Sequence, residues 1–208
     1  MSVRIELQYL PNVAYFSCLL KYEEVCIEAQ EHFVKQTFRN RCQILTANGV
    51  DTLIVPVIHT GGKVLIKDVK IDHSQNWIKR HWGSIVAAYG KAPFFDYFAD
   101  DFDSVYQKRH GYLFDLNWEI LTICLKLLRL KPTIRLTDMY QTHLADGQND
   151  ALSLINPKKD GGYNNLGVEV VYKQNFGTSF IPNLSVIDLL MCQGVEATHI
   201  LKQSVFVH

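Results

Sequence analysis

The first 29 residues contain two short apolar segments with a helical pattern between them, and this order constrains the fold more than any later feature. The apolar segments are residues 3–7 and 25–29. Pro11 suits the first turn of a helix, and apolar side chains recur at helical spacing across residues 13–20. A strand, a helix and a second strand in this order form a βαβ unit, in which the strands are parallel. The sequence therefore predicts an α/β fold.

The next segments predict a hairpin followed by helices. Strands are expected at residues 41–45 and 53–58, on either side of Asn48-Gly49, the dipeptide most typical of a tight hairpin turn. A further strand is expected at residues 64–71, where apolar and polar residues roughly alternate, and helices through most of residues 77–130. The full expectation is a mixed β-sheet with a βαβ-like start, flanked by helices, and a helical middle segment.

The last third of the chain is more polar. Residues 133–136 are expected to be extended, and a polar connection rich in Gly, Asn and Asp runs from about 142 to 166. Residues 168–172 predict a strand. Ser185 is expected to begin a short helix, with Asp188 completing a capping box. With 208 residues, the whole chain is expected to form a single domain.

Charge and cysteine content exclude several classes of function. The 21 cationic side chains balance the 21 anionic ones, so no global field attracts nucleic acid, and nucleic-acid binding is not expected. The N-terminus lacks the pattern of a signal peptide, and no run approaches the roughly 18 apolar residues of a membrane span. We therefore expect a cytoplasmic protein. The five cysteines are widely scattered without zinc or redox-motif spacing, so no metal site is expected.

Residues 35–42 concentrate positive charge. Three cations, Lys35, Arg39 and Arg41, lie within seven positions, and Asn40 separates the two arginines. If the segment is extended, the three cations share one face, and arginine binds phosphate or carboxylate through two parallel hydrogen bonds. The segment then predicts an anion-binding face. An edge strand with internal salt bridges to Glu28 or Glu31 is the alternative, and both interpretations remain open.

Two further groups of residues are candidates for substrate contacts. His81 is the best acid–base candidate, because imidazole titrates near neutral pH, and Lys79 beside it is positioned to hold an anion. Tyr172 and Gln174 would share one side of an extended segment, an arrangement that suits sugar recognition by stacking and an amide. Each also has an ordinary structural interpretation: His81 as a core residue, and Tyr172 as a packed aromatic.

The chain resembles the WbqC-like family of bacterial proteins through motifs spread over nearly its whole length. These motifs are Leu10-Pro11-Asn12-Val13-Ala14-Tyr15-Phe16, residues 35–42, Ala47-Asn48-Gly49, Leu53-Ile54-Val55-Pro56-Val57, Trp77 to His81-Trp82, Ala88-Tyr89 to Pro93-Phe94-Phe95, Leu113-Phe114-Asp115-Leu116-Asn117, Tyr172-Lys173-Gln174-Asn175-Phe176 and Pro182-Asn183-Leu184-Ser185-Val186-Ile187-Asp188-Leu189-Leu190. One departure is that Gln8 directly precedes Tyr9, whereas the family motif often has a Gln-Pro pair. The resemblance implies a context of surface-polysaccharide (O-antigen-type) gene clusters, in which a group-transfer role has been suggested.

These observations favour a cytosolic transferase of surface-polysaccharide biosynthesis. In this hypothesis Arg39, Asn40 and Arg41, with Lys35, hold the anionic part of a nucleotide sugar or acyl donor, and His81 deprotonates the acceptor. The transferred group, whether acyl, aminoacyl or formyl, is left open. The residues specify no cofactor and no oligomeric state, and they do not by themselves establish an enzyme.

Two alternatives stay open. The opening β-helix-β order also suits a nucleotide-dependent enzyme of the adenylyl-transfer kind, with phosphates over a helix N-terminus, although the expected His-x-x-His or His-x-Gly-His loop is missing. The other alternative is a non-catalytic sugar-binding or partner subunit of a glycan assembly pathway. In that case the aromatic-rich residues 94–102 would form a docking surface.

Overall fold

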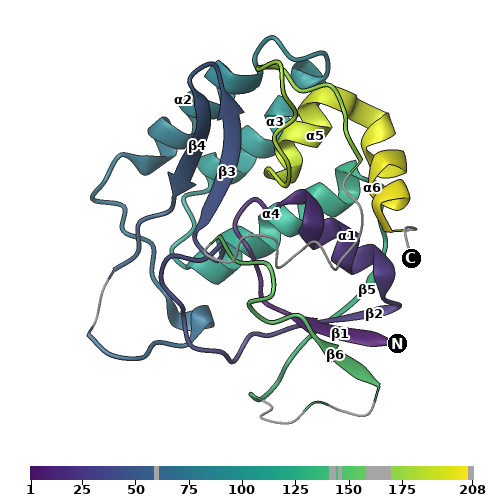
Figure 1. Cartoon of the computed structure of the whole chain (residues 1–208). Helices are drawn as coiled ribbons and strands as arrows, with labels where there is room; N and C mark the ends of the chain where they lie inside the picture. Colours follow the sequence, from purple (N-terminus) through teal and green to yellow (C-terminus); the bar gives the residue numbers. More distant parts are fainter. Residues whose placement is uncertain (59–60, 141–143, 145–146, 158–169, 206–208) are drawn as a thin grey trace.

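The computed structural model describes residues 1–58, 61–140, 144, 147–157 and 170–205. A four-stranded parallel sheet forms its base (Figure 1), with strands β1 (Ser2–Ile5), β2 (Glu24–Ile27), β5 (Thr133–Leu136) and β6 (Gln148–Asp150) in the order β5-β2-β1-β6. Helix α1 (Val13–Lys21) connects β1 to β2, and Val3 pairs with Val25 in parallel register. The predicted α/β class and βαβ start are confirmed.

A separate antiparallel hairpin follows, formed by β3 (Arg41–Thr46) and β4 (Gly49–Ile54). It stands apart from the parallel sheet, so the parallel and antiparallel pairings lie in two sheets (Figure 1). Gly49, at the turn, has a φ of 101°, a conformation that glycine adopts without steric cost. The hairpin predicted from Asn48-Gly49 is therefore confirmed, but its second strand is Gly49–Ile54 and not the predicted 53–58.

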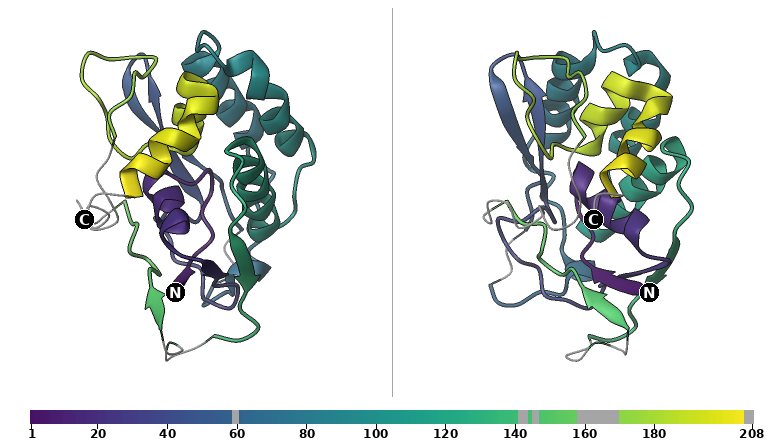
Figure 2. Two further views of the ribbon diagram at one scale, coloured as in Figure 1. Left: turned by 90° about the vertical axis from the view of Figure 1, so that its right-hand side faces the viewer. Right: turned by 45° about the vertical axis from the view of Figure 1, so that its right-hand side comes forward.

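Helices pack around these sheets. They are α2 (Trp77–Tyr89), α3 (Phe95–Gln107), α4 (Leu113–Leu127), α5 (Val186–Gln193) and α6 (Ala197–Val205), with short 3-10 helices η1 (Ile66–Asp68) and η3 (Gly194–Glu196). Helix α6 lies beside α1 (Figure 2), and the hydroxyls of Ser17 and Ser204 are 2.7 Å apart between them. The helical middle segment is confirmed. None of the helices in the described residues combines the length and the apolar character needed to cross a membrane.

Some strand predictions differ from the structure. The segment 64–71 forms η1 and isolated bridges, because its backbone groups bond to three different segments, residues 31–33, Ile58 and residues 111–113, instead of to one partner strand. Of the predicted strand 168–172, residues 170–172 have no regular structure and the first two positions lie outside the described residues. Strand β6 was not predicted; it is a short polar edge strand, and an edge position requires no apolar pattern.

Candidate functional site

Buried charged residues gather at the carboxyl ends of the central parallel strands. Glu6 follows β1, Glu28 and Glu31 follow β2, and none of these side chains is exposed by more than 4%. Strand β2 lies on one side of β1 and β6 on the other, so the strand order reverses at this point. Ligands of open α/β sheets bind outside the carboxyl ends of the strands at such a reversal. We call the three glutamates, with Gln8, Arg4 and Arg39, the carboxylate cluster.

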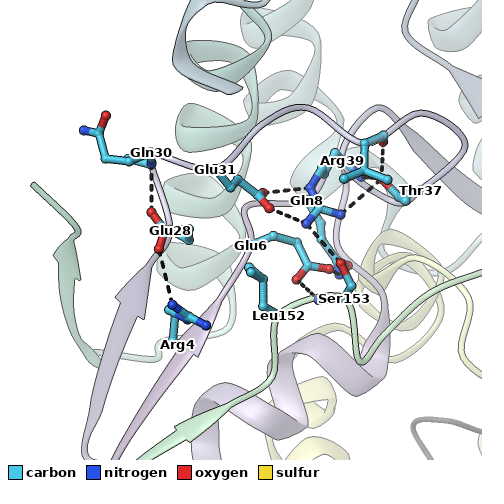
Figure 3. Close-up of polar contacts among 12 residues, drawn as sticks. Arg4, Glu6, Gln8, Glu28, Gln30, Glu31, Thr37, Arg39, Leu152 and Ser153 are labelled. Carbon is cyan, nitrogen blue, oxygen red and sulfur yellow. Dashed lines mark hydrogen bonds and ion pairs between the residues drawn. The ribbon is translucent and has the colours of Figure 1, made fainter. Parts of the chain in front are cut away.

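Arg39 is the central cation of this cluster (Figure 3). Its Nε and Nη2 donate to the two carboxylate oxygens of Glu31 at 2.7 and 2.6 Å, and Nη2 also donates to Ser153 Oγ at 3.2 Å. Asn117 on α4 donates to the Arg39 carbonyl at 2.7 Å. Burial raises the pKa of the Glu31 carboxyl, and the hydrogen bonds from Arg39 offset part of that rise. The paired charges hold the segment after β2 against the segment before β3.

Glu6 and Glu28 have different partners. Glu6 accepts hydrogen bonds from the Ser153 main-chain N–H at 2.7 Å and from Gln8 Nε2 at 3.0 Å. Glu28 accepts from the hydroxyl of Thr137 at 2.5 Å and lies 3.9 Å from Arg4 Nη1. Among the described residues no cation lies within ion-pair distance of Glu6. The cluster therefore contains three glutamate carboxyl groups and two guanidinium groups.

The basic segment divides its cations between the interior and a surface hollow. Residues 35–40 form turns instead of a strand, and Gln36 has a φ of 61°. Because the chain turns, Arg39 points into the carboxylate cluster, whereas Arg41 begins β3. The single basic face expected for Lys35, Arg39 and Arg41 is therefore not formed. The alternative salt bridge to Glu31 is present for Arg39.

Lys35, Asn40 and Arg41 line one hollow of about 610 Å³, which we call the Arg41 hollow. Its apolar wall is formed by residues 54–58, at the end of β4. Arg41 has no ion pair in the described part of the chain, and burial lowers its pKa. Arg41 Nε and Asn40 Oδ1 are buried atoms with no hydrogen-bond partner among the described residues. Two residues that line the hollow therefore each have a buried polar atom without a hydrogen-bond partner among the described residues, and one of the two residues is a cation.

His81 lies in the core. Its side chain is fully buried, and its Nδ1 is 2.8 Å from the hydroxyl of Tyr9, which is 2.6 Å from the hydroxyl of Tyr106. Burial lowers the pKa of His81 to about 4, the charge of Arg80 adds to this, and the Ile54 carbonyl offsets part of it. The ring is therefore neutral near pH 7. Its catalytic role stays a prediction, in a geometry without direct access to substrate.

Tyr172 and Gln174 meet at Asp188, far along the chain from the basic segment. The Tyr172 hydroxyl donates to Asp188 Oδ2 at 2.8 Å, and Gln174 Nε2 donates to the same oxygen at 3.1 Å. Gln174 also exchanges two hydrogen bonds with the backbone of Ile181. Ser185 begins α5 as predicted, but Asp188 anchors these two side chains instead of closing a capping box. Their sugar-binding role stays a prediction, whereas their observed contacts brace a loop.

Lys79 lines a second hollow, together with Trp82 and Arg109. Neither hollow contains a set of acidic, histidine or cysteine side chains suited to a metal, and no such set occurs elsewhere in the described residues. All five cysteines are free thiols. Cys42 is buried, and burial raises its pKa far above the ordinary value, which leaves it an unreactive thiol.

Sequence reasoning missed the roles of Glu6, Gln8 and Glu28. A usable pattern was present, because Glu6 and Glu28 are acidic residues near the carboxyl ends of the two predicted strands, residues 3–7 and 25–29. Carboxyl ends of parallel strands meet at one edge of a sheet, so the two acids could have been placed together from the predicted topology. Ser153 and Thr137 carry no such pattern, since their neighbours in space are distant in sequence.

Comparison with known proteins places the chain in a family. The model of the WbqC-like protein family matches residues 8–161 and 158–200. The chain is also 26% identical over 225 residues to "Uncharacterized protein Rv1507c" of Mycobacterium tuberculosis (strain ATCC 25618 / H37Rv), a match that covers 95% of this chain and 96% of that protein. No solved structure matches. Because the family model covers nearly the whole chain, the protein belongs to the WbqC-like protein family.

Proposed function

We propose that the protein is a transferase of bacterial surface-polysaccharide (O-antigen-type) biosynthesis, which binds the anionic part of its donor in the Arg41 hollow. The observation that carries this proposal is that Arg41 and Asn40, which both line one hollow, each have a buried polar atom, Arg41 Nε and Asn40 Oδ1, with no hydrogen-bond partner among the described residues. Buried polar atoms ordinarily have hydrogen-bond partners. A donor molecule bound in the hollow would supply these missing partners.

The hollow suits a ligand with an anionic group beside a hydroxyl or amide. Arg41 would donate to a phosphate or carboxylate, and Lys35 would add a second positive charge. Asn40 donates through Nδ2 to the Val55 carbonyl at 2.9 Å, which orients Oδ1 as an acceptor for a ligand hydroxyl or N–H. Asp72 is the acidic residue among those lining the hollow, so cations exceed anions there. Nucleotide sugars and acyl-CoA donors fit this description.

The carboxylate cluster would act as the rigid support of this hollow. Arg39, held by Glu31 and Asn117, lies between Phe38 and Asn40 in the chain and sets the point at which Arg41 leaves the turn. In this proposal His81 orients the hydroxyl of Tyr9 instead of taking a proton from the acceptor, because its ring is fully buried and its lowered pKa makes it a weak base. The transferred group remains an acyl, aminoacyl or formyl group.

A thermal-shift screen tests the proposal. Nucleotide sugars, acyl-CoAs, folate donors and ATP are added to wild type, Arg41→Ala and the control Arg129→Ala, which removes an exposed arginine outside the Arg41 hollow. A ligand at a hundred times its dissociation constant adds about 2.7 kcal/mol to the free energy of unfolding, a shift on the order of 5–10 °C for this chain length. We expect one donor class to stabilise wild type and Arg129→Ala but not Arg41→Ala. Equal shifts in all three proteins, or none with any donor, would refute the donor site.

The nucleotide-dependent alternative loses its phosphate site in this structure. The first N–H groups of α1 are already bonded: Val13 to the Leu184 carbonyl, Ala14 to Asn183 Oδ1 and Tyr15 to Asn12 Oδ1. A phosphate at this helix N-terminus would have to displace the segment that precedes α5. The reversal of strand order beside β1 still favours a ligand near the sheet, and the ATP arm of the screen tests it.

The docking-subunit alternative also loses support. Phe102 is 1% exposed, and Phe95 and Phe98 pack against the core. Tyr97 is the strongly exposed aromatic side chain of residues 94–102, at 76%. An isolated exposed aromatic is ordinary for a protein surface, so this segment gives no reason to infer a docking surface.

A further inference from the structure

A second hollow lies between the first half of α2 and the end of α3. It has a volume of about 490 Å³ and is lined by side chains that include Gln75, Lys79, Trp82, Tyr106 and Arg109. We call it the Trp82 groove. Lys79 lies in this groove and not with the other cations predicted to bind substrate. The groove therefore needs an explanation of its own.

The groove adjoins the Arg41 hollow, since Gln75 lines both. A tight turn separates the two: Asp72 Oδ1 accepts from the Ser74 N–H at 2.9 Å and from its hydroxyl at 2.6 Å, and Asp72 Oδ2 accepts from Gln75 Nε2 at 3.3 Å. Asp72 faces the Arg41 hollow, and Ser74 faces the groove. Two ligands bound in these hollows would be neighbours across one turn, as donor and acceptor must be.

The charge of the groove favours an anion. Lys79 and Arg109 are exposed cations with no ion pair in the described part of the chain. Asp103 is the carboxylate among the lining residues, and it accepts a hydrogen bond from Gln107 at 3.2 Å. Two cations against one carboxylate leave a net positive charge. Guanidinium and ammonium groups that line the same groove can both contact a carboxylate or a phosphate.

The aromatic wall of the groove is held in place. The Trp82 ring stacks on Phe95 at 27°, with centroids 6.4 Å apart, and also contacts Tyr106. Tyr106 is buried, and its hydroxyl is bonded to that of Tyr9. The amides of Gln75, Asn76 and Gln107 lie along the same groove. A fixed aromatic side chain beside several amide donors and acceptors is suited to the apolar face and hydroxyl groups of a sugar ring.

We propose that the Trp82 groove binds an anionic saccharide, a sugar that carries a carboxylate or a phosphate. Arg109 and Lys79 contact the anionic group, and the ring lies against Trp82. The inference rests on the proposed function in one respect: the saccharide is the acceptor of the group carried by the donor in the Arg41 hollow. It names the class of that acceptor and the residues that select it.

The backbone of Arg109 allows an unusually clean test. Arg109 follows the end of α3 with a φ of 50°, and Arg129 follows the end of α4 with a φ of 52°. Glycine is the usual residue at this position after a helix, so glycine at either site leaves the backbone unstrained. Arg129 lines neither hollow. Arg109→Gly and Arg129→Gly thus make the same chemical change in the same conformation, and one of the two lies in the groove.

The experiment is isothermal titration calorimetry, in which sugar probes are titrated into four proteins: wild type, Arg109→Gly, Arg129→Gly and Arg41→Ala. The probes are glucuronate and galacturonate for a carboxylate, glucose 1-phosphate for a phosphate, and glucose as the uncharged control. We expect one anionic probe to bind wild type, Arg129→Gly and Arg41→Ala with similar dissociation constants. Loss of a charge-assisted contact should weaken binding to Arg109→Gly by roughly tenfold or more. Glucose should bind more weakly than the anionic probe.

Three results would overturn the inference. They are an unchanged dissociation constant in Arg109→Gly, no binding of any anionic probe to wild type, and weakening in Arg41→Ala equal to that in Arg109→Gly, which would place the anion in the Arg41 hollow. Failure of the proposed function is separate. It appears in the donor screen, which depends on Arg41 and leaves the Arg109 comparison intact.

Discussion

The buried imidazole of His81 makes the stability of this protein depend on pH in a predictable way. Its pKa is lowered from 6.5 to about 4 by burial. In the unfolded chain His81 therefore binds a proton below pH 6.5, whereas in the folded chain the His81 ring stays neutral until about pH 4. Acid consequently favours the unfolded state through this residue, because the unfolded state binds more protons.

The size of the effect follows from the shift. One pKa unit corresponds to about 1.4 kcal/mol. Integrated over the titration, the loss in free energy of unfolding attributable to His81 is about 2 kcal/mol between pH 7 and pH 5, and about 3 kcal/mol by pH 4. His81→Gln removes the titrating group and keeps a polar partner for the Tyr9 hydroxyl. Its own cost at pH 7 should be about 1 kcal/mol, the value of one hydrogen bond.

Urea unfolding of wild type and His81→Gln at several values between pH 7 and pH 5 measures this difference. Other titrating groups contribute equally to both proteins and cancel in the subtraction. We expect the stability advantage of wild type to shrink by about 2 kcal/mol over this range and to change sign. A difference that stays constant with pH would show that the folded protein protonates His81 as readily as the unfolded chain. It would refute the assignment of a neutral, inaccessible ring.

Two further substitutions test the packing of the fold by chemical denaturation. Glu31→Gln leaves the buried Arg39 charge without its partner and should lower the free energy of unfolding by about 3–5 kcal/mol. The control Glu23→Gln, at an exposed ion pair, should change it little. Equal losses in the two variants would contradict a buried pair. Gly194→Ala places a Cβ 2.4 Å from the Phe94 ring at a φ of 57°, and it should cost about 2 kcal/mol or more. Gly83→Ala, on α2 with nothing within 4 Å of the new Cβ, is its control; no loss from Gly194→Ala relative to this control would show that the contact relaxes freely.

Local patterns in the sequence were sufficient for much of the fold. The βαβ start, the Asn48-Gly49 hairpin and the helical middle depend on spacing and turn chemistry within short segments, and the structure confirms them. The strand predicted at residues 64–71 was wrong. Alternation of apolar and polar residues predicts a strand only where one partner strand is available, and here three different segments share the hydrogen bonds of this segment. Strand β6 escaped prediction because an edge position imposes no apolar pattern.

The candidate site was predicted in part. Residues 35–41 were predicted to bind an anion, which stays a prediction; Lys35, Asn40 and Arg41 line one hollow, whereas Arg39 pairs with Glu31 in the interior. Lys79 was chosen for its charge, but its groove is completed by Arg109 at the end of another helix. Tyr172 and Gln174 were paired correctly, yet the acid that joins them, Asp188, was expected to cap a helix. Each difference arises from a contact between residues distant in sequence.

The sequence by itself determined that a lysine and an arginine would lie between the second and third strands of an α/β fold, and that a second arginine would begin the third strand. Only the tertiary structure decided which arginine forms a buried ion pair and which lines a hollow. Arg39 meets Glu31 in the interior, because a turn at residues 35–40 directs it there and a buried charge requires a partner. Arg41, two residues later, lines a hollow and forms no ion pair within the described residues. Spacing along the chain cannot distinguish these two arginines, since the anion that pairs with one of them is brought to it by the fold.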